Sequence, residues 1–254
     1  MIYDLQKANM WKRISAYLFD TIMLFIMIVG FAFVLSLIVN FDTYSEQYTA
    51  RQTVIEEQFG TSLDMSSDDY DKLSESEKKA FDDAVVAISS DEEAMYAFTM
   101  LFNLTLIITV FSVLLAYLIL EFIIPMCLGN GQTMGKKVFG IGVMRIDGVK
   151  VSGPILFIRT ILGKCTLETL VPVLLLIMII FGLVGFMGPI IILLILVTNI
   201  VMLCATESRL AIHDMLANTV SVDVASQLIF DTPEQLLEYK QKIHAESVEK
   251  AEYN

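Results

Sequence analysis

The 254-residue sequence has few charged residues, and this scarcity excludes the commonest classes of protein. Asp, Glu, Lys and Arg make up 18% of the chain, whereas hydrophobic residues make up 56%. Soluble domains carry roughly a quarter charged residues, and disordered chains contain few hydrophobic ones, so neither class fits this composition. We therefore expect a membrane protein.

Cysteine and histidine are also scarce, with three Cys and two His in the chain. Cys127, Cys165 and Cys204 are scattered, which indicates neither a disulfide framework nor a metal site. The sequence lacks H-E-x-x-H, G-x-S-x-G and a glycine-rich phosphate loop. The acids between 64 and 71 lack the turn glycine of an EF-hand loop. We expect no enzymatic activity, no metal, no cofactor and no nucleic-acid partner.

Long apolar runs are what the sequence does contain. The first covers 26 residues, and at ~1.5 Å per residue a helix of this length crosses a hydrocarbon core of roughly 30 Å. The last run is interrupted by Gly185, Gly188 and Pro189, which predict a tight turn between two antiparallel spans. A single kinked or re-entrant helix is the alternative. The four expected spans cover 14–39, 97–124, 170–186 and 189–205.

The basic residues of the short loops predict the orientation of these spans. Lys and Arg precede the first span, lie between the second and third, and follow the fourth, so these three segments should face the cytoplasm. The segment from Asp42 to Glu93 has 15 acidic and 4 basic residues and holds −11 of the net charge of −12. We expect a multi-pass protein of the cell membrane with cytoplasmic termini and an extracytoplasmic segment at 41–96.

The acidic segment is predicted to be helical. Ser74 with Glu77 forms a capping-box pattern, and Ser90 with Glu93 repeats it ahead of the second span. The helices between these caps should pack as a small hairpin. At the other end of the chain, Thr232 and Pro233 predict the start of a charged tail helix.

A small sheet and an interfacial helix are expected between the second and third spans. Asp147-Gly148 is a strong hairpin signal between strand-like runs at 138–146 and 149–152, and a third strand-like run lies at 219–224. The stretch 155–168, with Arg159 and Lys164 among apolar residues, resembles a helix that lies in the membrane interface.

These expectations define an all-α membrane protein with four transmembrane helices, both termini cytoplasmic, a helical acidic extracytoplasmic insertion and a small cytoplasmic β-hairpin or sheet. The expected segments are the N-terminus with span one at 1–40, the acidic segment at 41–96, span two at 97–124, the cytoplasmic loop at 125–169, spans three and four at 170–206, a His-Asp motif with the third strand at 207–224, and the tail at 225–254.

A few ionisable residues lie within or beside the apolar runs, where a lone charge costs about 2.5–3.5 kcal/mol on insertion scales. The topology brings them to one membrane depth. The candidate cluster consists of Arg13, Asp20, Glu121, Arg159, Glu168, His213 and Asp214. One interpretation is a structural charge network, with Arg13 reaching toward the interface. The other is a cation or proton site, with Asp20 as the central carboxylate and Glu121 or His213 as a relay.

Several motifs in this order resemble the RDD family of membrane proteins. The first helix opens with Trp11-Lys-Arg-Ile-Ser-Ala-Tyr-Leu-Phe-Asp20, Thr133-Met-Gly-Lys-Lys-Val-Phe-Gly140 precedes the expected sheet, and His213-Asp-Met-Leu-Ala-Asn-Thr-Val220 follows the last span. Arg13 and Asp20 match the family's Arg and first Asp, and Asp214 is the best match for its second Asp. The resemblance covers about 8–40 and 97–224.

The resemblance implies two classes of function, because some family members are implicated in sodium or potassium exchange for protons and others act as membrane partners of other proteins. A cation/proton antiporter with four spans would need a homo-oligomer to enclose a route. The alternative is a non-transporting scaffold or regulator that binds a partner protein through the acidic segment or the tail. A weaker third hypothesis assigns recognition of anionic membrane lipids to Arg159, Lys164 and Arg209.

Overall fold

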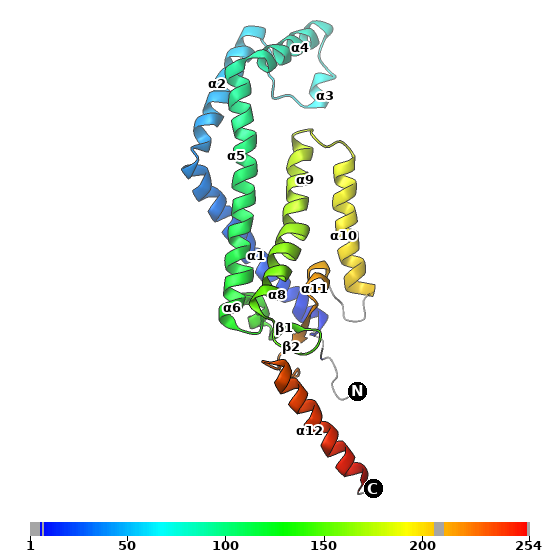
Figure 1. Ribbon diagram of the computed structural model, residues 1–254. Helices are drawn as coiled ribbons and strands as arrows, with labels where there is room; N and C mark the ends of the chain where they lie inside the picture. The colour runs from blue at the N-terminus through cyan, green and yellow to red at the C-terminus, as the bar shows by residue number, and fades with distance from the viewer. Residues whose placement is uncertain (1–5, 7, 206–210, 253–254) are drawn as a thin grey trace. The chain divides into compact units, whose positions relative to one another are not determined.

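The computed structural model describes residue 6 and residues 8–205 and 211–252. It is mostly helical, with one small sheet (Figure 1). Among the described residues, three helical stretches are long and apolar enough to cross a membrane: Met10–Ile38, Glu92–Leu128 and Gly153–Ile180. A shorter apolar helix, α10 (Met187–Ala205), follows them. This architecture confirms the expected all-α membrane fold with a small sheet.

The chain divides into two compact units, which we describe separately. Unit 1 consists of residues 1–29 and 112–254, and unit 2 consists of residues 30–111. Helix α1 (Met10–Ile38) and helix α5 (Glu92–Tyr117) each contribute to both units. The candidate site residues all belong to unit 1, and the whole acidic segment, 41–96, belongs to unit 2.

Unit 2 contains the helices of the acidic segment. They are α2 (Phe41–Phe59), α3 (Ser67–Tyr70) and α4 (Glu75–Ser90). Helices α2 and α4 pack together as expected, and each buries a single apolar residue, Ile55 in α2 and Ala84 in α4. The predicted capping box at Ser74 and Glu77 is present.

The second predicted capping box is replaced by a different cap. The Ala94 N–H donates to the Asp91 carboxylate at 2.9 Å, while the Ser90 hydroxyl donates to the Val86 carbonyl at the end of α4. Because Ser90 is still bonded within α4, the cap passes to Asp91. Arg51 of α2 pairs with the same carboxylate and so ties α2 to the start of α5.

In unit 1, the helix that follows the sheet is continuous. It runs through α8 (Gly153–Phe157), the π-helix η2 (Ile158–Leu170) and α9 (Val171–Ile180). The expected interfacial helix is therefore the first part of the third apolar helix. Helix α5 likewise continues through the π-helix η1 (Leu118–Ile123) into α6 (Ile124–Leu128).

Helices α9 and α10 pack side by side in opposite directions, as the predicted hairpin requires (Figure 1). The break comes earlier than expected. Gly182 has φ +68°, and its N–H donates to the Ile179 carbonyl, so this glycine ends α9. Gly188 lies within α10, where an added Cβ would approach Ile179 to 2.8 Å. It supports close helix packing rather than the turn.

The sheet has two strands rather than three. Strand β1 (Ile141–Arg145) pairs antiparallel with β2 (Thr219–Asp223), in the register Ile141 to Asp223. The Asp147-Gly148 turn forms, but the segment after it makes only isolated bridges, Met144 to Lys150 and Val149 to Phe230. The Lys150 N–H donates to the Phe230 carbonyl at 2.9 Å. A competing partner near Phe230 thus prevents the third strand.

Two short helices and a longer C-terminal helix complete unit 1. Helix α7 (Met134–Val138) precedes β1, α11 (Ile212–Leu216) precedes β2, and α12 (Pro233–Glu252) forms the tail. The Gln235 N–H donates to the Thr232 hydroxyl, so the predicted cap of the tail helix is present. Most of α12 is exposed, and Leu236 is buried.

Candidate functional site

The π-helix η2 arranges the polar residues of the third apolar helix. Arg159, Lys164 and Thr169 are spaced five residues apart, which would separate neighbours by about 140° in an α-helix with 3.6 residues per turn. In a π-helix the hydrogen bonds join residues five apart, so the three side chains lie on one face. Gly163 and Glu168 have the same spacing and form a second column. The π-helix therefore places on one side polar side chains that an α-helix would distribute around its circumference.

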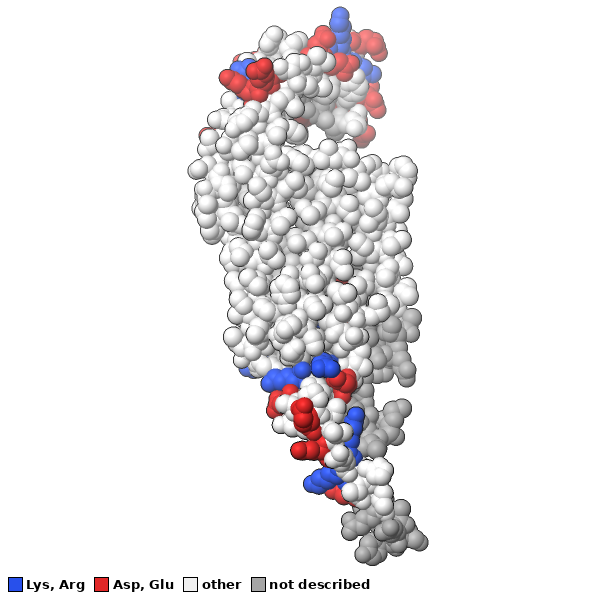
Figure 2. Space-filling view, in the orientation of Figure 1, with Lys and Arg blue, Asp and Glu red and all other residues white. Residues whose placement is uncertain are grey.

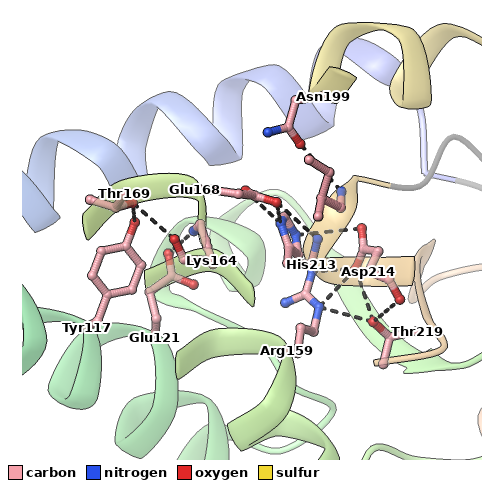
Figure 3. Close-up of polar contacts among 11 residues, drawn as sticks. Tyr117, Glu121, Arg159, Lys164, Glu168, Thr169, Asn199, His213, Asp214 and Thr219 are labelled. Carbon is pink, nitrogen blue, oxygen red and sulfur yellow. Dashed lines mark hydrogen bonds and ion pairs between the residues drawn. The ribbon is translucent and has the colours of Figure 1, made fainter. Parts of the chain in front are cut away.

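Arg159 forms the most deeply buried ion pair of the site. Its guanidinium Nη2 lies 2.8 Å from Asp214 Oδ1 in α11, and its Nε donates to the same oxygen at 2.9 Å. The Thr219 hydroxyl, at the start of β2, lies within 3.2 Å of Arg159 Nε and 3.1 Å of Asp214 Oδ1 (Figure 3). Arg159 and Asp214 are only 3% and 1% exposed. The group joins η2, α11 and the sheet.

A second ion pair links the two π-helices. Lys164 of η2 contacts the carboxylate of Glu121 in η1; Glu121 is buried and the Lys164 side chain is 12% exposed. The Lys164 ammonium also lies 5.9 Å from the ring centroids of Tyr17 and Tyr117, within the range of cation–π attraction. The Tyr117 hydroxyl shares a 2.7 Å hydrogen bond with Thr169. Two aromatic rings and a carboxylate therefore surround one ammonium.

His213 lies between two carboxylates. Its Nδ1 is 3.0 Å from both oxygens of Glu168, and its Nε2 is 3.7 Å from Asp214 Oδ2. The His213 backbone N–H also donates to Glu168. A Cβ added at Gly163 would lie 2.7 Å from His213 Cβ, so only glycine allows this approach of α11 to η2. The imidazole is positioned to hold a proton between the two acids.

Asp20 has a different environment from the other carboxylates. It accepts hydrogen bonds from the Thr133 hydroxyl and, at 2.7 Å, from the Gly135 N–H. A Cβ at Gly135 would lie 2.5 Å from the Ala16 carbonyl oxygen, so glycine permits this close contact between α7 and α1. Arg13 is half-buried two turns earlier on α1. Asp20 thus attaches the T-M-G-K-K segment to the first helix.

Near the site, Asp214 and Lys136 lie outside the apolar helices and have shifted pKa values. Burial alone would raise the pKa of Asp214, but the positive charge of Arg159 outweighs it and holds this pKa well below its usual range. Burial, together with the charge of Arg159, lowers the pKa of Lys136 to about 7, although Glu121 and Asp20 act in the opposite direction. Asp214 is therefore ionised near neutral pH.

The structure joins most of the sequence-predicted residues by direct contacts, whereas Asp20 has hydrogen-bond partners of its own. Direct contacts join Arg159 with Asp214, and His213 with Glu168 and Asp214; Glu121 enters the site through Lys164. Asp20 and Arg13 lie on α1, and Asp20 is hydrogen-bonded to the start of α7. In the described part of the chain, no three His, Cys, Asp or Glu side chains converge as metal ligands.

Sequence reasoning gave too little weight to several residues that build the site. The predicted cluster does not include Lys164, which the sequence places on the interfacial stretch. It also lacks four further residues of the site: Tyr117, Gly163, Thr169 and Thr219. The five-residue spacing of Arg159, Lys164 and Thr169 was the available signal. Residues with this spacing do not share a face in an α-helix, so the spacing indicates a common site only if the helix is a π-helix.

Comparison with known proteins identifies the family. The model of the RDD family matches residues 7–218, which include nearly the whole site. The chain therefore belongs to the RDD family, and its long apolar helices make it an integral membrane protein. No curated protein and no solved structure matched the chain.

Proposed function

We propose that this RDD-family protein is a small, non-enzymatic exchanger that couples the movement of Na⁺ or K⁺ to that of protons across the cell membrane. The observation that carries the proposal is the position of His213 between Glu168 and Asp214. A titratable imidazole in contact with two carboxylates, within a buried charge cluster, has the chemistry of a proton carrier.

The charges of the contacting side chains do not balance unless one more positive charge is present. Glu121, Glu168 and Asp214 contribute three negative charges, and Arg159 and Lys164 contribute two positive ones. Lys136 and Asp20, which lie nearby, carry opposite charges and offset each other. A charge buried without a partner is costly, so the cluster favours one additional cation. A proton on His213 supplies that charge.

Exchange follows from this imbalance. If a monovalent cation approaches the Glu168 carboxylate, it neutralises the same negative charge that the proton on His213 neutralises. The two positive charges would lie close together in a site shielded from water, and their repulsion disfavours simultaneous occupancy. Binding of one therefore promotes release of the other, which is the requirement for antiport.

The remaining candidate residues take supporting roles in this proposal. Glu121 holds Lys164 in place, and Arg159 keeps Asp214 ionised beside the imidazole. Asp20, bonded to Thr133 and Gly135, positions α7 against α1. We further propose that the termini are cytoplasmic, that residues 41–96 are extracytoplasmic, and that a homo-oligomer encloses the route.

A flux assay with matched histidine variants tests the proposal. Purified protein in vesicles containing a pH-sensitive dye should show proton flux when a Na⁺ or K⁺ gradient is imposed. His213→Gln, which keeps a similar size and removes the titratable ring, should abolish this flux. His244→Gln in the tail helix α12 is the control and should transport normally. Equal flux in both variants, with normal membrane insertion, would contradict the proposal.

The alternative function is a scaffold or regulator that binds a partner protein. It is favoured by the tail helix α12, where Leu237 and Val248 are 58% and 46% exposed, and by the many exposed acids of unit 2. Deletion of 227–254 should then remove a co-purifying protein. If the deleted protein keeps that partner, or if the intact protein has none and transports alone, the scaffold hypothesis is wrong.

A further inference from the structure

The T-M-G-K-K segment at α7 carries two lysines that the proposed exchange does not use. Lys136 is half-buried and Lys137 is exposed. No ion pair or side-chain hydrogen bond involves either ammonium group among the described residues. The other cations nearby are different, because Arg159 and Lys164 are both committed to buried carboxylates. Glu121 and Asp20 act on Lys136 through their charges only. Among the described residues, the two lysines of α7 therefore have no carboxylate in direct contact.

The depth of α7 follows from its contacts with α1. Gly135 contacts Asp20 and Ala16, and Ile141 after α7 packs on Ala8 and Ala16, so this segment runs antiparallel along the first turns of α1. Asp20 lies six residues beyond Ile14, where the apolar run begins, which corresponds to about 9 Å along the helix. Lys136 and Lys137 are thus placed within about 9 Å of the start of the apolar run, a depth from which a lysine side chain can extend toward the lipid headgroups.

The exposed face of α7 is apolar. Met134 and Val138 are 42% and 67% exposed and lie one turn apart on the same side of the helix. Trp11, at the start of α1, is 75% exposed, as is common for residues of the membrane interface. Within unit 1, Figure 2 shows Lys and Arg side chains gathered at one border of the uncharged surface. Apolar side chains beside lysines match a ligand with an acyl chain and a negative headgroup.

We propose that α7 is a binding site for an anionic phospholipid, with the headgroup phosphate on Lys136 and Lys137 and an acyl chain on Met134 and Val138. The surroundings of Lys136 support this assignment. Burial and the positive charge of Arg159 lower its pKa to about 7 although the charges of Glu121 and Asp20 oppose this shift, and a further anion beside it would favour the ammonium form. The site differs from the one expected from the sequence, since Arg159 and Lys164 are already paired and Arg209 lies outside the described residues.

Lipid binding to the full-length protein in detergent tests the proposal. The probes are phosphatidylglycerol and the zwitterionic phosphatidylcholine, and bound lipids are counted by native mass spectrometry. The wild type should prefer phosphatidylglycerol. Lys136→Gln should weaken its binding about fivefold, the effect expected of one basic residue near an anionic surface. Lys79→Gln on the exposed surface of α4 removes the same charge and should change nothing.

Two further measurements distinguish a lipid site from a site for free phosphate. Val138→Ser should weaken binding of both lipids, because it changes the acyl contact and leaves the charges intact. Inorganic phosphate should not displace phosphatidylglycerol; displacement at equal concentration would identify a site for free phosphate and overturn the proposal. Equal lipid binding by Lys136→Gln and the wild type would also overturn it. If Lys136→Gln does not fold, unchanged binding in Val138→Ser is the decisive contrary result.

Discussion

The charged side chains of unit 2 are mostly exposed to solvent, whereas those of the site in unit 1 are mostly buried and paired. Unit 2 contains nearly all the excess acid of the chain, and most of its carboxylates are exposed on α2, α3 and α4. The site in unit 1 has fewer charges, but Arg159 and Asp214 are almost completely buried and contact one another. Exposed charges are solvated and need no fixed partner, whereas a buried charge requires one. Net charge is therefore a poor guide to where charge determines structure.

Removing Arg159 should have the largest effect on stability. Arg159→Met leaves Asp214 buried without its cation, which costs about 3–5 kcal/mol for a broken buried pair. Arg145→Met is the control, because Arg145 pairs with Asp147 at the surface, where the two side chains are 39% and 46% exposed, and such pairs contribute about 0–1 kcal/mol. Thermal unfolding in detergent measures both variants. Similar losses in the two would show that burial does not distinguish these pairs.

Acidification should reveal the same difference without a mutation. The pKa of Asp214 is held below its usual value in the folded protein, so its ionised form contributes stability above the unfolded value of about 3.9. That contribution is lost as the pH falls from about 4 through the folded pKa. Unfolding temperatures measured from pH 6 to pH 3 should fall more steeply for the wild type than for Asp214→Asn. Parallel curves would exclude Asp214 as the group responsible.

The contact between η2 and α11 provides a test that changes no charge. Gly163→Ala places a Cβ 2.7 Å from His213 Cβ and should cost about 1–3 kcal/mol through overpacking. It should also reduce transport by moving His213 away from Glu168. Gly30→Ala in α1 meets no atom within 4 Å and should be neutral or slightly stabilising. A Gly163→Ala protein as stable as the wild type would show that α11 does not depend on this contact.

Local patterns predicted the apolar helices and the caps at Ser74 and Thr232, because length, hydropathy and capping chemistry act within a few residues. The parts that sequence reasoning missed depend on distant partners. The sequence could not distinguish the two-stranded sheet of β1 and β2 from a three-stranded one, because the hydrogen bond from the Lys150 N–H to the distant Phe230 carbonyl is visible only in the structure. The contact of Asp20 with Gly135 joins residues far apart in the sequence. The π-helix η2 is another example. Its five-residue spacing matters only because α11 and η1, which are distant in the sequence, supply the partners of Arg159 and Lys164.

The smallest effect should come from unit 2, where a hydrogen bond rather than a buried charge holds the structure. Ser74→Ala removes the capping box of α4 and should cost about 1 kcal/mol, the usual effect of losing an N-cap. Because α2 and α4 bury little besides Ile55 and Ala84, this loss should open α4 locally. Hydrogen exchange should therefore accelerate across α4 and stay unchanged in β1 and β2. Ser89→Ala is the control, because the Ser89 hydroxyl donates to the Val85 carbonyl near the other end of the same helix. Acceleration throughout the protein would show that the two units unfold together.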